Sequence, residues 1–265
     1  MSVLSVRNLT KSFGGVVALN DVSFDVAAGE LLALIGPNGA GKSTAFNAIN
    51  GQLPPDQGSV TFDGREIVGL PPRRIWRLGV GRTFQITATF PSMTVIENVQ
   101  MALISHHHRL RALLPVAGQL YRDEAHALLT LVGMDDQAER PCGFLAYGDL
   151  KRVELAVALA NDPKLLLMDE PTAGMAPKER IDLMQLTAGI VAERNMAVLF
   201  TEHDMDVVFA HANRIIVLNR GMLVAEGLPD EVRADEDVKA IYLGTGAVYD
   251  TSAEKGPAAE GQGVA

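Results

Sequence analysis

Residues 36–44 read Gly-Pro-Asn-Gly-Ala-Gly-Lys-Ser-Thr, and this run constrains the fold more than any other feature. It matches the phosphate-binding pattern G-x-x-x-x-G-K-[ST], in which glycines let several backbone N–H groups point at one phosphate chain. Lys42 would add a positive charge at the β- and γ-phosphates, and Ser43 would offer a hydroxyl ligand to Mg²⁺. The sequence therefore predicts a nucleotide site at Gly36, Pro37, Asn38, Gly39, Ala40, Gly41, Lys42, Ser43 and Thr44.

The two flanks of this loop are typical of a strand and a helix. Glu30–Ile35 is a short apolar run that predicts a buried strand, and Ser43–Asn50 predicts a helix. The dipole at the N-terminus of that helix favours phosphate groups. A chance glycine-rich turn is the alternative, and the order strand, loop, Lys-Ser and helix argues against it.

The composition limits which partners and compartments the chain can have. With 265 residues and 48% hydrophobic content, it can form one large domain or two small ones. A formal charge of −9 argues against nucleic-acid partners, which need a basic face. Cys142 is the only cysteine, so no intramolecular disulfide is possible, and a reducing compartment is the simpler interpretation. Neither a signal sequence nor an apolar run of the ~18–20 residues that span a membrane is present, so we expect a cytoplasmic chain that reaches a membrane through a partner.

The first half of the chain combines strand patterns with a helical block. Alternating apolar residues predict half-buried antiparallel strands at 4–9 and 22–26, with another strand at 59–63. Residues 94–133 read as mostly helical and differ in composition from their flanks. This block is therefore predicted to be a helical subdomain.

The second half predicts a parallel sheet. An apolar strand at 164–169, a helix at 177–194 and a strand at 197–201 follow one another, and that order implies parallel strands. A hairpin pattern follows at 214–226. Residues from about 247 onward are rich in Gly, Ala and Glu and predict a disordered tail.

Two carboxylates end the apolar strand at 165–170, which reads Leu-Leu-Leu-Met-Asp-Glu. Asp169 could hold Mg²⁺ through water, and Glu170 could activate the attacking water as a general base. His203 follows the next strand and could bind the γ-phosphate, and Gln85 could reach Mg²⁺. The alternatives are that acidic residues cap strand ends and that a lone histidine is structural.

Two further segments carry polar groups whose role is open. Leu145–Asp149 precedes an apolar-periodic helix at 150–160, and a glycine at a helix start is suited to an anion, yet the chain offers no phosphate there. His106, His107 and His108 could suggest a metal site or a tag, but adjacent residues on a helix point in different directions. We expect a solvated helix end or loop for these histidines.

The ordered set of motifs resembles that of the ATP-binding cassette (ABC) ATPases: Phe13, GPNGAGKST at 36–44, Gln85, LAYGD at 145–149, LLLMDE at 165–170 and His203. The resemblance covers residues 1 to about 245. It implies an α/β fold, a P-loop NTPase with a RecA-like core, an antiparallel β-subdomain and an α-helical subdomain at about 90–160. The ABC domain would span 1–246, with a tail at 247–265.

The resemblance also assigns roles within a dimer. In this family the signature segment completes the ATP site of a second subunit, so that two ATPs lie between head-to-tail subunits. That segment here is Leu145, Ala146, Tyr147, Gly148 and Asp149. Phe13 stands where the family places an aromatic ring against adenine, with plain core packing as the alternative.

Four shorter segments resemble one branch, the importer ATPases for branched-chain amino acids and related solutes: 81–85, 90–98, 201–206 and 240–244. Such ATPases lie on the cytoplasmic face of the inner membrane, with two permease subunits, a second ATPase subunit that is the same or different, and an external solute-binding protein. The permease would insert a coupling helix near residues 85–97. An exporter ATPase and a soluble, non-transport ABC protein are the alternatives.

Three residues depart from the family pattern. Ala146 replaces the usual signature serine, Asp149 replaces a residue that is often Gln, and Ala176 replaces an Asp that helps to link the two sites. These losses of polar groups lead to the hypothesis that the two ATP sites of the assembly are not equivalent.

Overall fold

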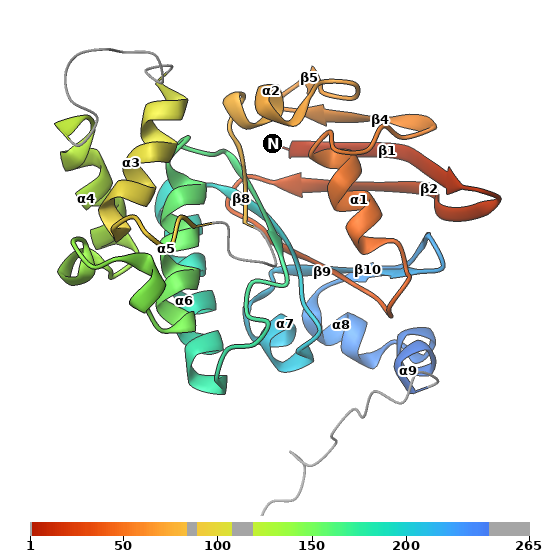
Figure 1. Cartoon of the computed structure of the whole chain (residues 1–265). Helices are drawn as coiled ribbons and strands as arrows, with labels where there is room; N and C mark the ends of the chain where they lie inside the picture. Colours follow the sequence, from red (N-terminus) through yellow and green to blue (C-terminus); the bar gives the residue numbers. More distant parts are fainter. Residues whose placement is uncertain (1, 84–88, 108–118, 244–265) are drawn as a thin grey trace, which may run out of the picture.

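A six-stranded sheet carries the nucleotide motifs (Figure 1). The computed structural model describes residues 2–83, 89–107 and 119–243. The strand order is β10-β9-β3-β8-β7-β6, and all neighbours pair in parallel except the hairpin of β9 and β10. The strands are β3 (Leu31–Ile35), β6 (Val80–Arg82), β7 (Leu165–Asp169), β8 (Ala197–Thr201), β9 (Arg214–Asn219) and β10 (Met222–Gly227). The central strands β3 and β8 are buried throughout, as expected for a parallel sheet covered on both faces.

A four-stranded antiparallel sheet forms a second layer, with the order β2-β1-β4-β5. Its strands are β1 (Ser2–Phe13), β2 (Val16–Ala27), β4 (Gln57–Phe62) and β5 (Arg65–Glu66). Leu4 and Val6 of β1 are buried while their neighbours are more exposed, which is the alternation that the sequence predicts. Helix α1 (Lys42–Ile49) packs with this sheet through a shared core that includes Phe46 and Phe62.

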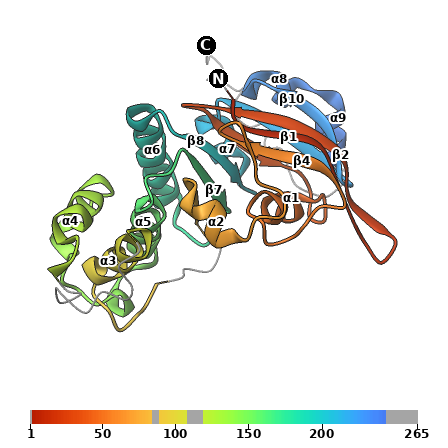
Figure 2. The ribbon, with the colours of Figure 1, turned by 90° about the horizontal axis from the view of Figure 1, so that it is seen from above.

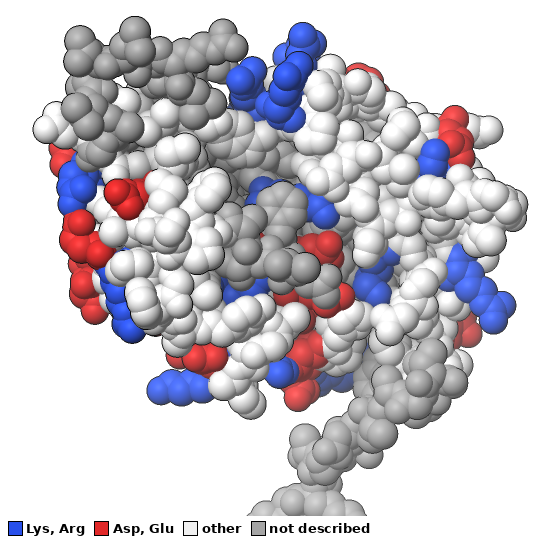
Figure 3. All heavy atoms as spheres, in the orientation of Figure 1, with Lys and Arg blue, Asp and Glu red and all other residues white. Residues whose placement is uncertain are grey.

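The remaining helices cover the parallel sheet or extend to one side of it. Helices α3, α4 and α5 lie together, away from the antiparallel sheet (Figures 1 and 2). On the face seen in Figure 1, acidic and basic side chains are interspersed (Figure 3). Thr94 and Glu97 form a capping box that fixes the start of α3. The helices are α2 (Pro72–Arg77), α3 (Val95–His106), α4 (Arg122–Leu131), α5 (Tyr147–Leu159), α6 (Pro177–Arg194), α7 (Met205–His211), α8 (Pro229–Ala234) and α9 (Glu236–Leu243).

Two details differ from the sequence-based expectations. Helix α5 begins at Tyr147, three residues before the predicted start at 150. Ala146, with extended backbone angles, is the N-cap residue, and Gly148 is already helical. The predicted helix end is confirmed, since His106 is the last residue of α3 and His107 follows it. The histidines are not simply solvated, however, because the ring of His106 packs on Trp76 and that of His107 packs on Tyr121. His108, Gln85 and the tail from 247 lie outside the described residues.

Candidate active site at the phosphate loop

The phosphate loop joins β3 to α1 at the carboxyl end of the parallel sheet, where ligands of open α/β sheets bind. Gly36 starts the loop with a φ of 150°, and a Cβ at this residue would lie 2.1 Å from the carbonyl oxygen of Leu218. Only glycine therefore lets the loop lie this close to β9.

The side chain of Lys42 folds back into the loop. Its Nζ donates to the carbonyl oxygens of Gly36 (2.6 Å) and Pro37 (3.2 Å), and the residue is only 8% exposed. Burial lowers the pKa of Lys42, while the negative charges of Glu170 and Asp169 act against this shift. An amine held in this way can exchange the loop carbonyls for the oxygens of a phosphate chain.

Thr201 at the end of β8 binds the carboxylate of Asp169 and the backbone of Glu170. Its hydroxyl donates to Oδ1 of Asp169 (2.9 Å), and its own oxygens accept from the backbone N–H of Glu170 (3.1 Å). Asp169 and Thr201 are paired directly in the parallel register. The sequence analysis missed Thr201, although its place at the end of the neighbouring strand was a usable signal.

The structure brings together the predicted base and the predicted histidine. Nε2 of His203 lies 2.7 Å from Oε1 of Glu170, whose backbone takes the left-handed conformation with a φ of 48°. The histidine side chain is 49% exposed and that of Glu170 is 20% exposed, so the pair opens to solvent. This geometry suits a carboxylate that accepts a proton from water, with the neighbouring imidazole holding the carboxylate in place.

Glu202 is a buried carboxylate behind this pair that the sequence analysis also missed. Its Oε1 accepts from the backbone N–H (2.8 Å) and the hydroxyl (2.7 Å) of Thr172. Burial raises the pKa of Glu202, the bonds from Thr172 lower it, and the charge of Glu170 raises it further. Glu202 thereby fixes the turn that follows Glu170.

A cavity of about 180 Å³ unites the loop with Glu170 and His203. Ser43, Glu170 and His203 all line it, and Ala18 of β2 forms another wall. The residues of the loop that line it are Asn38, Gly39, Ala40, Gly41, Lys42, Ser43 and Thr44.

The oxygen atoms of one side chain at this cavity and of one at the end of β7 are of the kind that fits Mg²⁺. Ser43 and Asp169 offer a hydroxyl and a carboxylate, which are the hard ligands that Mg²⁺ prefers, while Gln85 lies outside the described residues. Among the described residues, no group of three His, Cys, Asp or Glu could hold a metal. Nucleotide enzymes usually hold Mg²⁺ by one or two protein ligands that phosphates and water complete.

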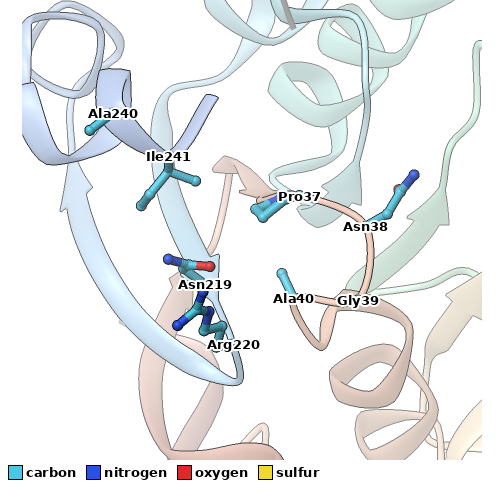
Figure 4. Close-up of a pocket in the computed structure, with 8 residues that line it drawn as sticks. All are labelled: Pro37, Asn38, Gly39, Ala40, Asn219, Arg220, Ala240 and Ile241. Carbon is cyan, nitrogen blue, oxygen red and sulfur yellow. The ribbon is translucent and has the colours of Figure 1, made fainter. Parts of the chain in front are cut away.

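The outer side of the phosphate loop rests on the hairpin of β9 and β10 (Figure 4). The N–H of Gly221 donates to the carbonyl of Ala40 (2.9 Å), and its carbonyl accepts from the N–H of Asn20 (2.8 Å). A second cavity of about 380 Å³ separates this side of the loop from Ala240 and Ile241 of α9. The turn thus ties the loop to β2 as well as to β9.

Phe13 ends β1 with a ring that is 48% exposed, so plain core packing was the wrong alternative for this residue. Lys11 Nζ lies 5.6 Å from the centroid of that ring. Contact between Phe13 and adenine stays a prediction.

The segment Leu145–Asp149 is not part of the cavity at the phosphate loop. Ala146 has extended backbone angles and precedes the first residue of α5 without a side-chain cap, and Tyr147 is 42% exposed. Asp149 accepts a long hydrogen bond from Gln137 (3.4 Å). Ala146 and Tyr147 are thus exposed at the start of α5, whereas Gly148 is buried beside the carboxylate of Glu179.

Comparison with known proteins identifies the family of this site. Residues 19–173, which hold the phosphate loop, the segment 145–149 and the pair Asp169–Glu170, match the family model described as ABC transporter. The chain belongs to the ABC transporter family. As an ABC ATPase it binds ATP or ADP and hydrolyses ATP. Among the described residues, no helix has the length and apolar character needed to span a membrane. Residues 223–248 also match a model described as branched-chain amino acid ATP-binding cassette transporter.

Curated relatives and solved structures agree with this assignment. The high-affinity branched-chain amino acid transport ATP-binding proteins LivG of Salmonella typhimurium and BraF of Pseudomonas aeruginosa are each 40% identical to this ABC chain, over 91% of its length and 98% of theirs. The ADP conformation of MJ1267, an ATP-binding cassette of an ABC transporter, has a TM-score of 0.82 and 32% identity, and it covers 92% of this chain and 99% of its own. The resemblance to ABC ATPases and the predicted fold class are confirmed.

Proposed function

We propose that this chain is the ATP-hydrolysing subunit of an importer for branched-chain amino acids or a related small polar solute. The pair of Glu170 and His203 at the mouth of the phosphate-loop cavity is the observation that carries the ATPase part. The solute class is supported by the relatives LivG and BraF and by the match at residues 223–248.

The proposed hydrolysis uses three side chains of this chain directly. Lys42 binds the β- and γ-phosphates, Glu170 takes a proton from the attacking water, and His203 holds Glu170 and contacts the γ-phosphate. Mg²⁺, held by Ser43, Asp169 and Gln85, would neutralise charge on the phosphates. Phe13 would pack on the adenine.

The proposed active form is a head-to-tail dimer. Leu145–Asp149 of one subunit would supply the N–H groups of its helix N-terminus to the γ-phosphate bound at the loop of the other. A post-hydrolysis structure of the ATP-binding cassette MJ0796 with ADP and Pi is described as dimeric, at 29% identity and a TM-score of 0.72. Loss of the γ-phosphate would remove the bridge and let the dimer open.

The proposed location is the cytoplasmic face of the inner membrane, where the chain is peripheral. Two permease subunits would receive the motion of the dimer through coupling helices near residues 85–97, and an external binding protein would deliver the solute. The second ATPase subunit is a copy of this chain or a different one.

The two ATP sites are proposed to be unequal when the second ATPase is a different chain. Ala146 offers no hydroxyl to a γ-phosphate, and Ala176, which precedes α6, offers no carboxylate to the partner. Replacing the catalytic glutamate in each ATPase in turn tests this. Unequal losses of turnover are expected, and equal losses would contradict the inequality.

Uptake of radiolabelled leucine tests the solute class, in cells that lack the chain and are complemented with wild type or Glu170→Gln. We expect wild type to restore uptake and Glu170→Gln to leave it at background. Tagged Glu170→Gln, isolated with MgATP from mild-detergent membranes, should bring two permease chains with it by mass spectrometry. Isolation without any membrane protein would contradict the transport role.

A further inference from the structure

Arg82 is a buried cation beside the proposed metal ligand Asp169. Its side chain is 9% exposed, and its Nη2 lies 3.6 Å from Oδ2 of Asp169, whose side chain is 18% exposed. The other oxygen, Oδ1, accepts the hydrogen bond of Thr201. Both oxygens of Asp169 thus face polar groups of the protein.

The register of the sheet places these two residues on the same face. Strands β6 and β7 are parallel, and Arg82 lies opposite Leu167, so that Asp169 two residues further points to the same side. The preceding Gly81 is needed for this fit, because a Cβ there would lie 2.7 Å from the carbonyl oxygen of Ala158 in α5.

The guanidinium is also anchored to the helix that follows the phosphate loop. Nη1 and Nη2 both donate to Oδ1 of Asn47 in α1 at 3.1 Å, and Nη1 donates to Oε1 of Gln52 at 3.2 Å. Helix α1 begins at Lys42. One side chain therefore connects the phosphate-binding helix, the end of β7 and the strand that leads to Gln85.

We propose that Arg82 is a positioning residue that acts as the internal counter-cation of Asp169 and sets how strongly the site takes Mg²⁺. The inference rests on the proposed metal role of Asp169. Without Arg82, the neighbouring carboxylates of Asp169 and Glu170 would still face the charge of Lys42 but no longer that of the guanidinium. Such a cluster costs stability in the free protein and attracts a divalent cation more strongly.

The test compares the purified full-length chain as wild type, Arg82→Gln and Arg82→Lys. Arg7→Gln is the matched control, since Arg7 forms an ion pair of 2.7 Å with Asp25 on the exposed antiparallel sheet. Thermal unfolding without metal and calorimetric ADP binding at graded MgCl₂ are measured. Neither readout depends on turnover.

For Arg82→Gln we expect an unfolding midpoint about 3–6 °C below wild type without metal. Added Mg²⁺ should recover part of this loss. The Mg²⁺ concentration that half-saturates ADP binding should fall by about three- to tenfold, because a positive charge beside the metal ligand is gone. Arg82→Lys keeps that charge, so its half-saturating Mg²⁺ should stay within about twofold of wild type, as should that of Arg7→Gln.

An Arg82→Gln chain with the wild-type midpoint and the wild-type Mg²⁺ dependence would overturn the proposal. A half-saturating Mg²⁺ concentration of Arg82→Lys that falls by about three- to tenfold would also overturn it. This second result can be measured even if Arg82→Gln does not fold. A wild-type chain that binds no ADP at any Mg²⁺ concentration would instead count against the proposed function of the site.

Discussion

The phosphate loop and the segment Leu145–Asp149 both present backbone N–H groups at a helix start, yet their surroundings are opposite. The phosphate loop, with Ala18 of β2, Glu170 and His203 around its cavity, is the enclosed half of the comparison, and its lysine is buried. Leu145–Asp149 is the open half, where Phe144 just before it is 72% exposed and Tyr147 is 42% exposed, although Gly148 is buried. One chain therefore forms a cavity at its phosphate loop to which the second helix start does not contribute, which fits the proposal that this segment serves a partner subunit.

The largest expected effect separates chemistry from binding within the enclosed half. Glu170→Gln removes the proposed general base while keeping a hydrogen-bonding side chain opposite His203. We expect steady-state ATP hydrolysis to fall by about 100-fold or more, with ATP affinity near that of wild type. Phosphate release and equilibrium binding of a fluorescent ATP analogue measure the two properties. Hydrolysis at the wild-type rate would show that Glu170 is not the base.

Removing the lysine should damage the enclosed half itself. Lys42→Ala deletes a buried cation that is placed for the phosphate chain, and charge-assisted bonds of this kind contribute about 1.5–3 kcal/mol each. We therefore expect MgADP affinity of the isolated chain to fall by about 10- to 100-fold in calorimetry. An unchanged affinity would mean that the loop binds phosphate through its backbone alone.

A negative charge at position 146, in the open half, should lower hydrolysis without weakening MgADP binding to the isolated chain. Ala146→Asp supplies the side-chain cap that α5 lacks, so the folded chain should keep or gain stability, by up to about 1 kcal/mol. The same carboxylate would repel the γ-phosphate of a partner, and hydrolysis should fall by about tenfold or more. MgADP affinity of the isolated chain should stay within about twofold of wild type. Weakened affinity in the isolated chain would contradict the separation of the two halves.

The smallest effect is expected from adding a hydroxyl group at position 146. Ala146→Ser provides a cap of similar strength without negative charge and restores a donor for a partner's γ-phosphate. We expect turnover to rise by about two- to fivefold, at equal MgADP affinity. A rate unchanged or lowered relative to wild type would show that the backbone N–H groups of α5 suffice.

Local patterns predicted the elements around the enclosed half well because each of them is a single continuous segment of the sequence. The phosphate loop, the strand at 165–169 and the helix at 177–194 all lie where the apolar periodicity and the glycine pattern indicate. The start of α5 was placed too late, since the glycine and aspartate after Tyr147 read as loop residues, although they form the first turn.

The supporting polar groups could not be predicted from such patterns. Thr201 and Arg82 act on Asp169 from two different neighbouring strands, so their roles depend on the register of β6, β7 and β8. Glu202 stands next to the predicted His203, but only the fold shows that it is buried against Thr172. Side-chain roles that cross strands become visible only once the pairing is known.

Sedimentation of Glu170→Gln with MgATP tests most directly the claim that the open segment completes the site of a second chain. We expect the mass to double on addition of MgATP, and Glu170→Gln combined with Ala146→Asp to remain monomeric under the same conditions. A single mutant that stays monomeric at saturating MgATP, or a double mutant that dimerises equally well, would contradict it.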